Sequence, residues 1–205
     1  MITENKLNKI KKLAKNRIKN IIVVLEDIKD KHNAGAILRT CDAFGIPYVY
    51  FIFNKVEEYE PKDLISSSVG SSKWLVYKIF SKKNFGNPVI SCIKELKEKD
   101  FKIIATIVDE KANNIFYFNW PDKVALFLGN EVNGLSEEVI KNSDFKVYIP
   151  MKGMVESLNV SVSAGIFIYD FIFKKYINNN KIEFFDKKSQ QEYVNQILNN
   201  LNYNL

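Results

Sequence analysis

Three short polar segments carry the side chains that could do chemistry in this sequence. They are residues 33–39 (NAGAILR), 129–134 (GNEVNG) and 157–161 (SLNVS). Together they hold one arginine, one glutamate and several amides and hydroxyls, which can orient and stabilise a polar ligand. Each segment follows an expected strand, and open α/β sheets bind ligands beyond the carboxyl ends of their strands. We therefore predict that these three polar segments meet in one site.

The two charged residues of these segments also have structural explanations. Arg39 lies six residues into an expected helix and could pair with Asp42, three residues later. Such a surface pair contributes only about 0.2–0.5 kcal/mol. Glu131 lies beside a glycine turn and could be a solvated loop residue. Neither residue by itself shows whether the polar segments form a functional site.

The amides and hydroxyls could be helix caps. Asn33 is a good N-cap for the helix that follows it, and Ser157 and Asn159 could cap the last long helix. Glycines at 35, 129, 134 and 153 would allow tight turns and a close approach of the backbone. Taken together, three polar segments at strand ends are harder to explain as caps than any one of them.

Several common catalytic sets are missing from the sequence. His32 is the only histidine, so a Ser-His-Asp or Cys-His nucleophile would have to use it. Neither GxGxxG after the first expected strand nor GxxxxGK[ST] is present. Cys41 and Cys92 stand far apart, and no cluster of His, Cys and Asp has metal-site spacing. We therefore expect no metal.

Composition indicates one globular domain with a basic surface. The 205 residues are 46% hydrophobic and 26% charged, and the net charge of +6 suits a polyanionic partner such as RNA. An AT-rich coding sequence would also enrich lysine, asparagine and isoleucine. Two unpaired cysteines, no signal peptide and a longest apolar run (164–173) too short for a bilayer predict a cytoplasmic protein without a membrane span.

Strands that alternate with helices predict an α/β fold with a mainly parallel sheet and helices on both faces. We expect strands at 21–25, 48–53, 74–80, 103–108, 124–128 and 147–151, and helices at 4–18, from 33 to 44, at 88–98, from a Ser136 cap, after 159 and in the tail. A loop should hold Asn113 and Asn114. We divide the chain into a basic N-terminal helix (1–20), the main domain (21–176) and a C-terminal helical extension (177–205).

Two segments allow two interpretations each. The amphipathic helix at 4–18 either packs with one side solvated or binds RNA phosphates through its lysines. Residues 54–73, which include SSSVGSS, are either a flexible connection or a substrate loop rich in hydroxyls and amides. The tail helix packs either on the main domain or on a partner chain.

The order and spacing of the three polar segments resemble the SpoU/TrmH family of S-adenosylmethionine-dependent RNA 2'-O-ribose methyltransferases, in the SPOUT class. Residues 33–39 fit N-x-G-x-x-x-R, residues 129–134 fit G-x-E-x-x-G, and residues 149–161 fit I-P-M, a glycine and S-L-N-V-S. The resemblance covers about residues 20–175. It is strongest to the branch that methylates the D-loop guanosine at tRNA position 18; methylation of ribosomal RNA and a non-catalytic RNA-binding module are the alternatives.

The resemblance implies a fold and an assembly that composition does not indicate. The last strands and helix would form a deep trefoil knot, an exception to the rule that chains are not knotted. The knot would bind S-adenosylmethionine through backbone groups near Thr106, Gly129, Ile149 and Leu158. Family members are homodimers, with the active site near the subunit interface, and their partner would be tRNA.

The resemblance also implies roles for the polar side chains. Arg39 matches the catalytic arginine of the family. A free guanidinium is a poor base, because its pKa lies above about 12, so we expect it to orient the RNA phosphate and stabilise the oxyanion. Asn33, Glu131, Ser157 and Asn159 would position Arg39 and the ribose.

Overall fold

The computed structural model describes residues 2–177 and 182–201, so the expected C-terminal extension (177–205) is described in part. The helices are α1 (Glu4–Lys15), α2 (Lys31–Ala43), α3 (Pro88–Glu98), α4 (Glu137–Asn142), α5 (Val160–Ile177) and α6 (Lys187–Asn200), with 3-10 turns η1 (Pro61–Leu64), η2 (Ser71–Trp74) and η3 (Ile115–Tyr117). The strands are β1 (Ile21–Glu26), β2 (Tyr48–Phe53), β3 (Val76–Ser81), β4 (Lys102–Thr106), β5 (Asn113–Asn114), β6 (Val124–Leu128) and β7 (Phe145–Tyr148). No helix in these ranges has the length and apolar character to cross a bilayer.

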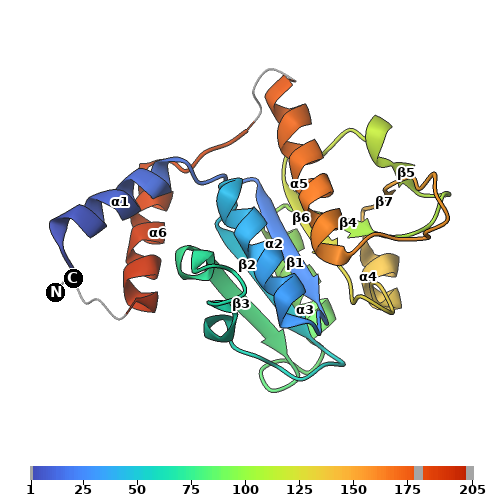
Figure 1. The fold of residues 1–205 in the computed structure, drawn as a ribbon, viewed down its shortest axis with the longest axis horizontal. Coiled ribbons are helices and arrows are strands. Elements are labelled where there is room, and N and C mark those ends of the chain that lie inside the picture. The colour runs from blue at the N-terminus through green and yellow to red at the C-terminus, as the bar shows by residue number, and fades with distance from the viewer. Residues whose placement is uncertain (1, 178–181, 202–205) are drawn as a thin grey trace.

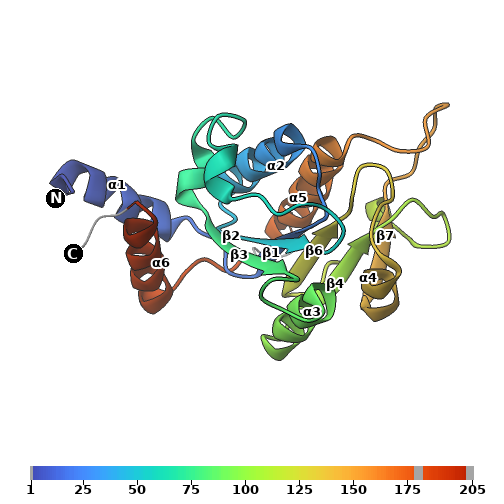
Figure 2. The same cartoon turned by 90° about the horizontal axis from the view of Figure 1, so that it is seen from below.

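The strands form one seven-stranded sheet in the order β3-β2-β1-β6-β4-β7-β5, and every pairing is parallel. Helices α2 and α5 cover one face, and α3 and α4 cover the other (Figures 1 and 2). Strand β1 is buried throughout because alternate side chains serve both faces: Val23 and Leu25 pack under α2 and α5, whereas Ile22 and Val24 pack over α3. The predicted α/β fold with a parallel sheet is confirmed.

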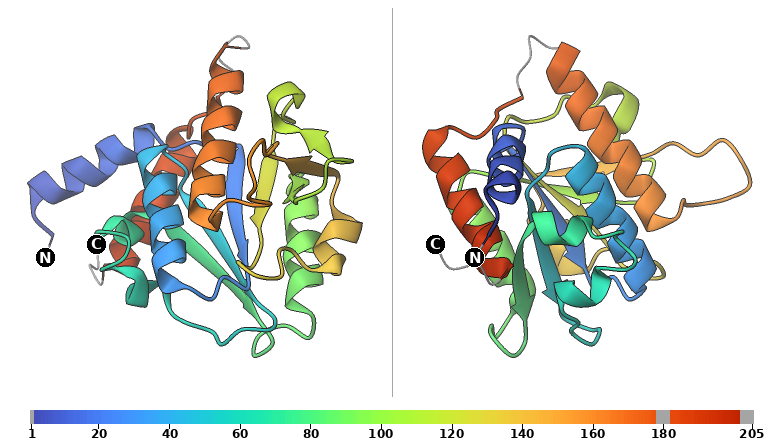
Figure 3. Two further views of the ribbon diagram at one scale, coloured as in Figure 1. Left: turned by 45° about the vertical axis from the view of Figure 1, so that its right-hand side comes forward. Right: turned by 60° about the vertical axis from the view of Figure 1, so that its left-hand side comes forward.

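Helices α1 and α6 pack against each other beyond the β3 edge of the sheet (Figure 3). Their contact is apolar and includes Ile10 and Ala14 of α1 and Tyr193, Val194 and Ile197 of α6. The tail helix therefore packs on its own chain, one of the two predicted arrangements.

Helix α1 ends at Lys15, earlier than the predicted end at residue 18. Arg17 and Ile18 lie outside the helix because other contacts hold them. Arg17 is fully buried, and Ile18 forms a β-bridge with Phe184.

Two predicted strands near the site differ from the structure. Strand β7 is Phe145–Tyr148 rather than 147–151, because Phe145 is in register with Ile104 of β4 and the chain then leaves the sheet. The predicted loop at Asn113 and Asn114 is strand β5, a two-residue pairing with β7. Smaller differences are that β3 begins at residue 76 and β4 ends at residue 106.

The serine-rich part of residues 54–73 is folded against α2. Several serine hydroxyls there donate to backbone carbonyls of the same segment; Ser68 donates to Ile65 and Ser71 to Ser68. Gly35 of α2 lies so close to Ser67 that an added Cβ would meet its Oγ at 2.2 Å. These contacts give the segment a packing role, and its use as a substrate loop stays a prediction.

Candidate active site

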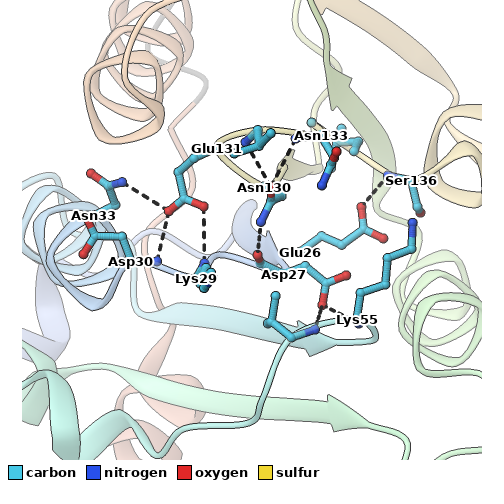
Figure 4. Close-up of a pocket in the computed structure, with 14 residues that line it drawn as sticks. Glu26, Asp27, Lys29, Asp30, Asn33, Lys55, Asn130, Glu131, Asn133 and Ser136 are labelled. Atoms are coloured by element: carbon cyan, nitrogen blue, oxygen red, sulfur yellow. Dashed lines mark hydrogen bonds between the residues drawn. The ribbon is translucent and has the colours of Figure 1, made fainter.

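The three polar segments meet at the carboxyl ends of β1 and β6, where a chain of hydrogen bonds joins them. Asn33 donates from Nδ2 to Glu131 Oε1 at 3.1 Å, and Asn159 donates from Nδ2 to Asn33 Oδ1 at 2.9 Å. Figure 4 shows Glu131 reaching from its loop toward Asn33 on α2. The predicted meeting of the three segments is confirmed, whereas the roles of their side chains stay predictions.

Glu131 also holds the start of helix α2. Its Oε2 accepts from the backbone N–H of Lys29 at 3.3 Å, and its Oε1 accepts from that of Asp30 at 3.2 Å. A carboxylate at a helix N-terminus is favoured by the helix dipole and by the unpaired amides there. The alternative of a merely solvated loop residue is therefore wrong.

The N-cap of α2 is Asp30. The interpretation of Asn33 as the N-cap of this helix is therefore wrong. Asp30 has an extended backbone, and its Oδ1 accepts from the N–H of His32 at 2.8 Å. The helix thus begins earlier than predicted. Because Asp30 does the capping, both polar atoms of Asn33 are available to bridge Glu131 and Asn159.

Asn159 both caps a helix and bridges to Asn33. Its Oδ1 accepts from the N–H of Ser161 at 2.8 Å and from the Ser161 hydroxyl at 2.6 Å at the start of α5, which leaves Nδ2 for Asn33. Ser157 is exposed, and its hydroxyl makes no hydrogen bond within the described ranges. The capping interpretation therefore describes one function of Asn159 and does not describe Ser157.

The loop that carries Glu131 is held by Asn130, which is not among the site residues predicted from the sequence. Its backbone exchanges two hydrogen bonds with Gly134, at 3.0 and 2.9 Å. Its side chain accepts from Val132 and Asn133 and donates to the Asp27 carbonyl at 2.7 Å. An asparagine between turn glycines is the signal that could have identified it.

Every predicted site residue except Arg39 lines one cavity of about 440 Å³, the Leu158 cavity. The predicted cofactor-binding residues Thr106, Gly129, Ile149 and Leu158 all line it, together with Asn33, Glu131, Ser157 and Asn159. Leu128, Met151 and Phe167 add apolar surface. Its volume falls in the range of about 300–1,000 Å³ typical of small-molecule sites. An apolar wall beside amides, hydroxyls and a carboxylate suits a ligand with both aromatic and charged parts.

Arg39 lies on the solvent-facing side of α2, outside this cavity. Six residues on an α-helix correspond to a rotation of about 240° from Asn33, so the two side chains leave the helix in different directions. The predicted pair with Asp42 is wrong, because Asp42 Oδ1 accepts from the buried Arg17 at 2.6 Å. In the described part of the chain, the Arg39 side chain makes no hydrogen bond or ion pair.

A second cavity of about 750 Å³, the Glu26 cavity, lies on the other side of the 129–134 loop. Glu26 and Asp27 reach it from the end of β1 (Figure 4). Asp27 has a φ of +53°, and its Oδ1 accepts three backbone N–H groups from residues 54–56. Burial raises the pKa of the Glu26 carboxyl, although a hydrogen bond from Ser136 opposes the shift. Neither carboxylate is among the site residues predicted from the sequence.

Comparison with known proteins identifies the family. The model of the SpoU rRNA Methylase family matches residues 20–169. The chain is 35% identical over 170 residues to the tRNA (guanosine(18)-2'-O)-methyltransferase of Aquifex aeolicus, an alignment that covers 83% of this chain and 77% of the relative. It is 29% identical over 207 residues to the protein of the same name in Borreliella burgdorferi, which covers 98% and 90% of the two chains.

Solved structures agree with this result. The crystal structure of the A. aeolicus TrmH/SpoU tRNA-modifying enzyme aligns with a TM-score of 0.80 at 28% identity and covers 95% of each chain. The SpoU methyltransferase AviRb of Streptomyces viridochromogenes, solved with the cofactor AdoMet, aligns with a TM-score of 0.64 at 25% identity over 78% of this chain and 59% of that one. The hydrogen-bonded motifs, the family match and these structures together place the chain in the SpoU rRNA Methylase family.

Proposed function

We propose that this protein transfers a methyl group from S-adenosylmethionine to the 2'-oxygen of the guanosine at position 18 of tRNA, in the cytoplasm. The observation that carries the proposal is the chain of hydrogen bonds from Glu131 through Asn33 to Asn159, three residues that line the Leu158 cavity. The relatives described above are named for this reaction on tRNA. Methylation of ribosomal RNA is the second candidate, because the family as a whole is named for it.

The residues of the Leu158 cavity fit S-adenosylmethionine. The apolar side chains of Leu128 and Met151 suit an adenine ring, and the Glu131 carboxylate suits a cationic sulfonium or ammonium group. When bound, S-adenosylmethionine supplies an electrophilic methyl group. This methyl carbon would pass from the sulfonium sulfur, which would leave as a neutral thioether, to the ribose 2'-oxygen, whose proton would pass to solvent water.

The protein then has to position the ribose and stabilise the developing negative charge on its oxygen. Asn33 is held in one orientation because its Oδ1 accepts from Asn159 while its Nδ2 donates to Glu131. Arg39 supplies a positive charge without a partner in the described part of the chain. We assign it to the phosphate beside the target ribose and to the oxyanion, since a guanidinium binds phosphate in a fixed fork.

A second copy of the chain would complete this site. Helix α5 exposes a stripe of apolar side chains at spacings of three, four and seven: Val162, Tyr169, Phe173 and Tyr176. The rings of Tyr169 and Phe173 stack with their centroids 5.8 Å apart. Tyr169 also packs against the ring of Phe44, which directly follows α2. Helix α2 carries Arg39. We propose a homodimer formed through this stripe. A Tyr169→Lys variant should be monomeric in sedimentation equilibrium; an unchanged dimer would exclude this interface.

Strand β7 lies outside β4, yet the α5 helix that follows it packs beside α2, so residues 149–159 cross the carboxyl edge of the sheet. We infer that this crossing forms the trefoil knot.

We also propose that the lysines of α1 bind tRNA phosphates, with α6 packed against α1 as its support. The N-terminal helix and the C-terminal extension would then act as parts separate from the main domain.

The test is transfer of label from S-adenosylmethionine to unmodified tRNA, followed by mapping of the methylated nucleoside. We expect label at guanosine 18 and a loss of at least about tenfold in Arg39→Ala. Label on ribosomal RNA fragments in preference to tRNA would support the second candidate. Absence of label on both, with the Arg39→Ala variant indistinguishable from the parent, would sink the enzymatic proposal and favour an RNA-binding module.

A further inference from the structure

The Glu26 cavity adjoins the Leu158 cavity, in which the methyl donor would bind under the proposed function. It shares Asn33, Asn130, Glu131, Val132 and Gly134 with the Leu158 cavity, so the two cavities meet along one wall. The chain of hydrogen bonds that would position the ribose forms part of this wall. A nucleoside whose ribose lies at the wall can therefore direct its base into the Glu26 cavity while the methyl donor occupies the other.

Glu26 has a free hydrogen-bonding atom there. Its side chain is only 1% exposed and lines the cavity. Its Oε2 accepts from the N–H of Ser136 at 2.8 Å, but its Oε1 is buried without a hydrogen-bond partner in the described residues. Buried polar atoms nearly always have a partner. An ionised carboxylate can only accept hydrogen bonds, so the missing partner is an N–H or O–H donor.

The charge of the cavity indicates which part of a nucleotide it can hold. Four carboxylates line it, from Glu26, Asp27, Asp30 and Glu131, against two lysines. Such a lining repels a phosphate and suits the N–H groups of a base. Val56 and Leu135 supply apolar surface against which a flat ring can pack.

We propose that Glu26 is the residue that selects guanine, with its free Oε1 accepting hydrogen bonds from the Watson–Crick edge of the target base. Guanine presents two adjacent donors on that edge, N1–H and the 2-amino group, and proteins read unstacked RNA bases on this edge. Adenine instead presents an acceptor at N1. This nitrogen would face the carboxylate oxygen without a proton between them, so the binding of adenine is disfavoured. This proposal rests on the function proposed above.

Lys55 lines the same cavity as Glu26, and its positive charge favours the ionised form of the Glu26 carboxyl. Figure 4 shows its side chain extending past the Glu26 carboxylate toward Ser136. Lys55 is exposed, so it can swing outward without disturbing the core. Its ammonium would then be free to meet the phosphate of the incoming nucleotide.

The test compares tRNA transcripts that carry guanosine or adenosine at the target position. The parent should prefer guanosine strongly in kcat/KM. In Glu26→Gln, the amide oxygen can still accept from Ser136 while the amino group donates toward adenine N1. We therefore expect the guanosine-to-adenosine ratio to fall at least about tenfold, with activity lost on guanosine and gained on adenosine.

Matched measurements separate this role from a structural one. Glu137→Gln changes an exposed glutamate paired with Lys141 on α4, and it should leave the ratio unchanged. An equal loss on both transcripts in Glu26→Gln, or an unchanged ratio, would overturn the base-reading proposal while leaving the methyltransferase function intact. Tight Mg²⁺ binding that Glu26→Gln abolishes would also overturn it, by identifying a cation site. A parent inactive on every RNA would instead refute the proposed function.

Discussion

At the scale of residues, the site depends on Asn33 being fixed between two partners. Its amide accepts from Asn159 on one side and donates to Glu131 on the other. Glu131 in turn is fixed by the two backbone N–H groups, of Lys29 and Asp30, that directly precede α2. All three side chains are thus oriented before any substrate arrives, which is the condition for efficient positioning in catalysis.

Replacing Glu131 with glutamine should disturb this orientation without unfolding the protein. The two carboxylate oxygens accept three N–H donors, from Lys29, Asp30 and Asn33, whereas a glutamine would turn an NH₂ group toward some of them. We expect kcat to fall by roughly 10–100-fold with little change in melting temperature. Glu137→Gln serves as the control, and equal activities of the two variants would contradict the role of Glu131.

Glu26 makes stability depend on pH. Burial raises its pKa above the ordinary value of 4.5, so just above pH 4.5 the folded state holds a proton that the unfolded chain has released. Stability from this residue is therefore present at lower pH and is lost as pH rises through that window. Glu26→Gln cannot ionise, so its melting temperature relative to the parent should be higher at about pH 7.5 than at about pH 4. A difference that does not vary with pH would contradict this prediction.

At the scale of elements, the 129–134 loop separates the two cavities and depends on a glycine at its base. A Cβ added to Gly129 would meet the Gly134 carbonyl carbon and the Leu135 nitrogen at 2.3 Å. Both are backbone atoms, so neither can move aside without opening the loop. The Glu131 carboxylate would then shift away from α2.

Gly129→Ala should therefore lower stability by roughly 2 kcal/mol or more and abolish binding of S-adenosylmethionine. Gly153→Ala is a matched control in the 150–158 segment, because an added Cβ meets nothing within 4 Å there. Thermal melts and calorimetry of both variants test the prediction. Undiminished donor binding by Gly129→Ala would show that the loop tolerates the shift.

The elements that sequence reasoning placed correctly are those specified by local signals. Strand β6 is a continuous apolar run, and helix α3 has an Asn87 cap followed by proline. Strand β5 was missed because its two residues are extended only through pairing with β7. The predicted pairing of Arg39 with Asp42 was wrong for a similar reason. The actual partner, Arg17, is distant in sequence, and only the packing of the folded chain brings it close. The motifs located most of the residues that line the Leu158 cavity. The unpartnered carboxylate oxygen of Glu26 could not be predicted, because it depends on burial in the folded chain.

At the scale of the whole molecule, one buried arginine joins the two ends of the described chain to the sheet domain. Arg17 donates to Asp42 at 2.6 Å, to the Trp74 carbonyl at 2.7 Å and to Tyr193 Oη on α6 at 3.0 Å. The Tyr193 hydroxyl also donates to the Trp74 carbonyl at 2.6 Å. Helices α1 and α6 are therefore held in one orientation relative to the sheet, which the tRNA-binding role proposed for α1 would require.

Removing the Arg17 side chain should lower the free energy of unfolding. Arg17→Met leaves Asp42 and Tyr193 without their buried partner, and breaking a buried pair in this way costs about 3–5 kcal/mol. The side chains of the nearby pair Lys19 and Glu183 are 40% and 46% exposed, so Lys19→Met should lower stability by at most about 1 kcal/mol. Urea unfolding of both variants measures the difference, and equal midpoints would contradict a structural role for Arg17.

The packing of α1 on α6 has a consequence for how the chain is made. Ile10 and Ala14 emerge early from the ribosome, but the apolar surface that buries them, including Tyr193 and Ile197, is synthesised more than 170 residues later. During translation this face of α1 therefore stays uncovered until α6 has been made. At about 5–20 residues per second, the time between synthesis of the two helices is on the order of 10–40 s. A chaperone that shields nascent apolar segments would find its binding site here, and stalled chains that lack α6 should be its preferred clients.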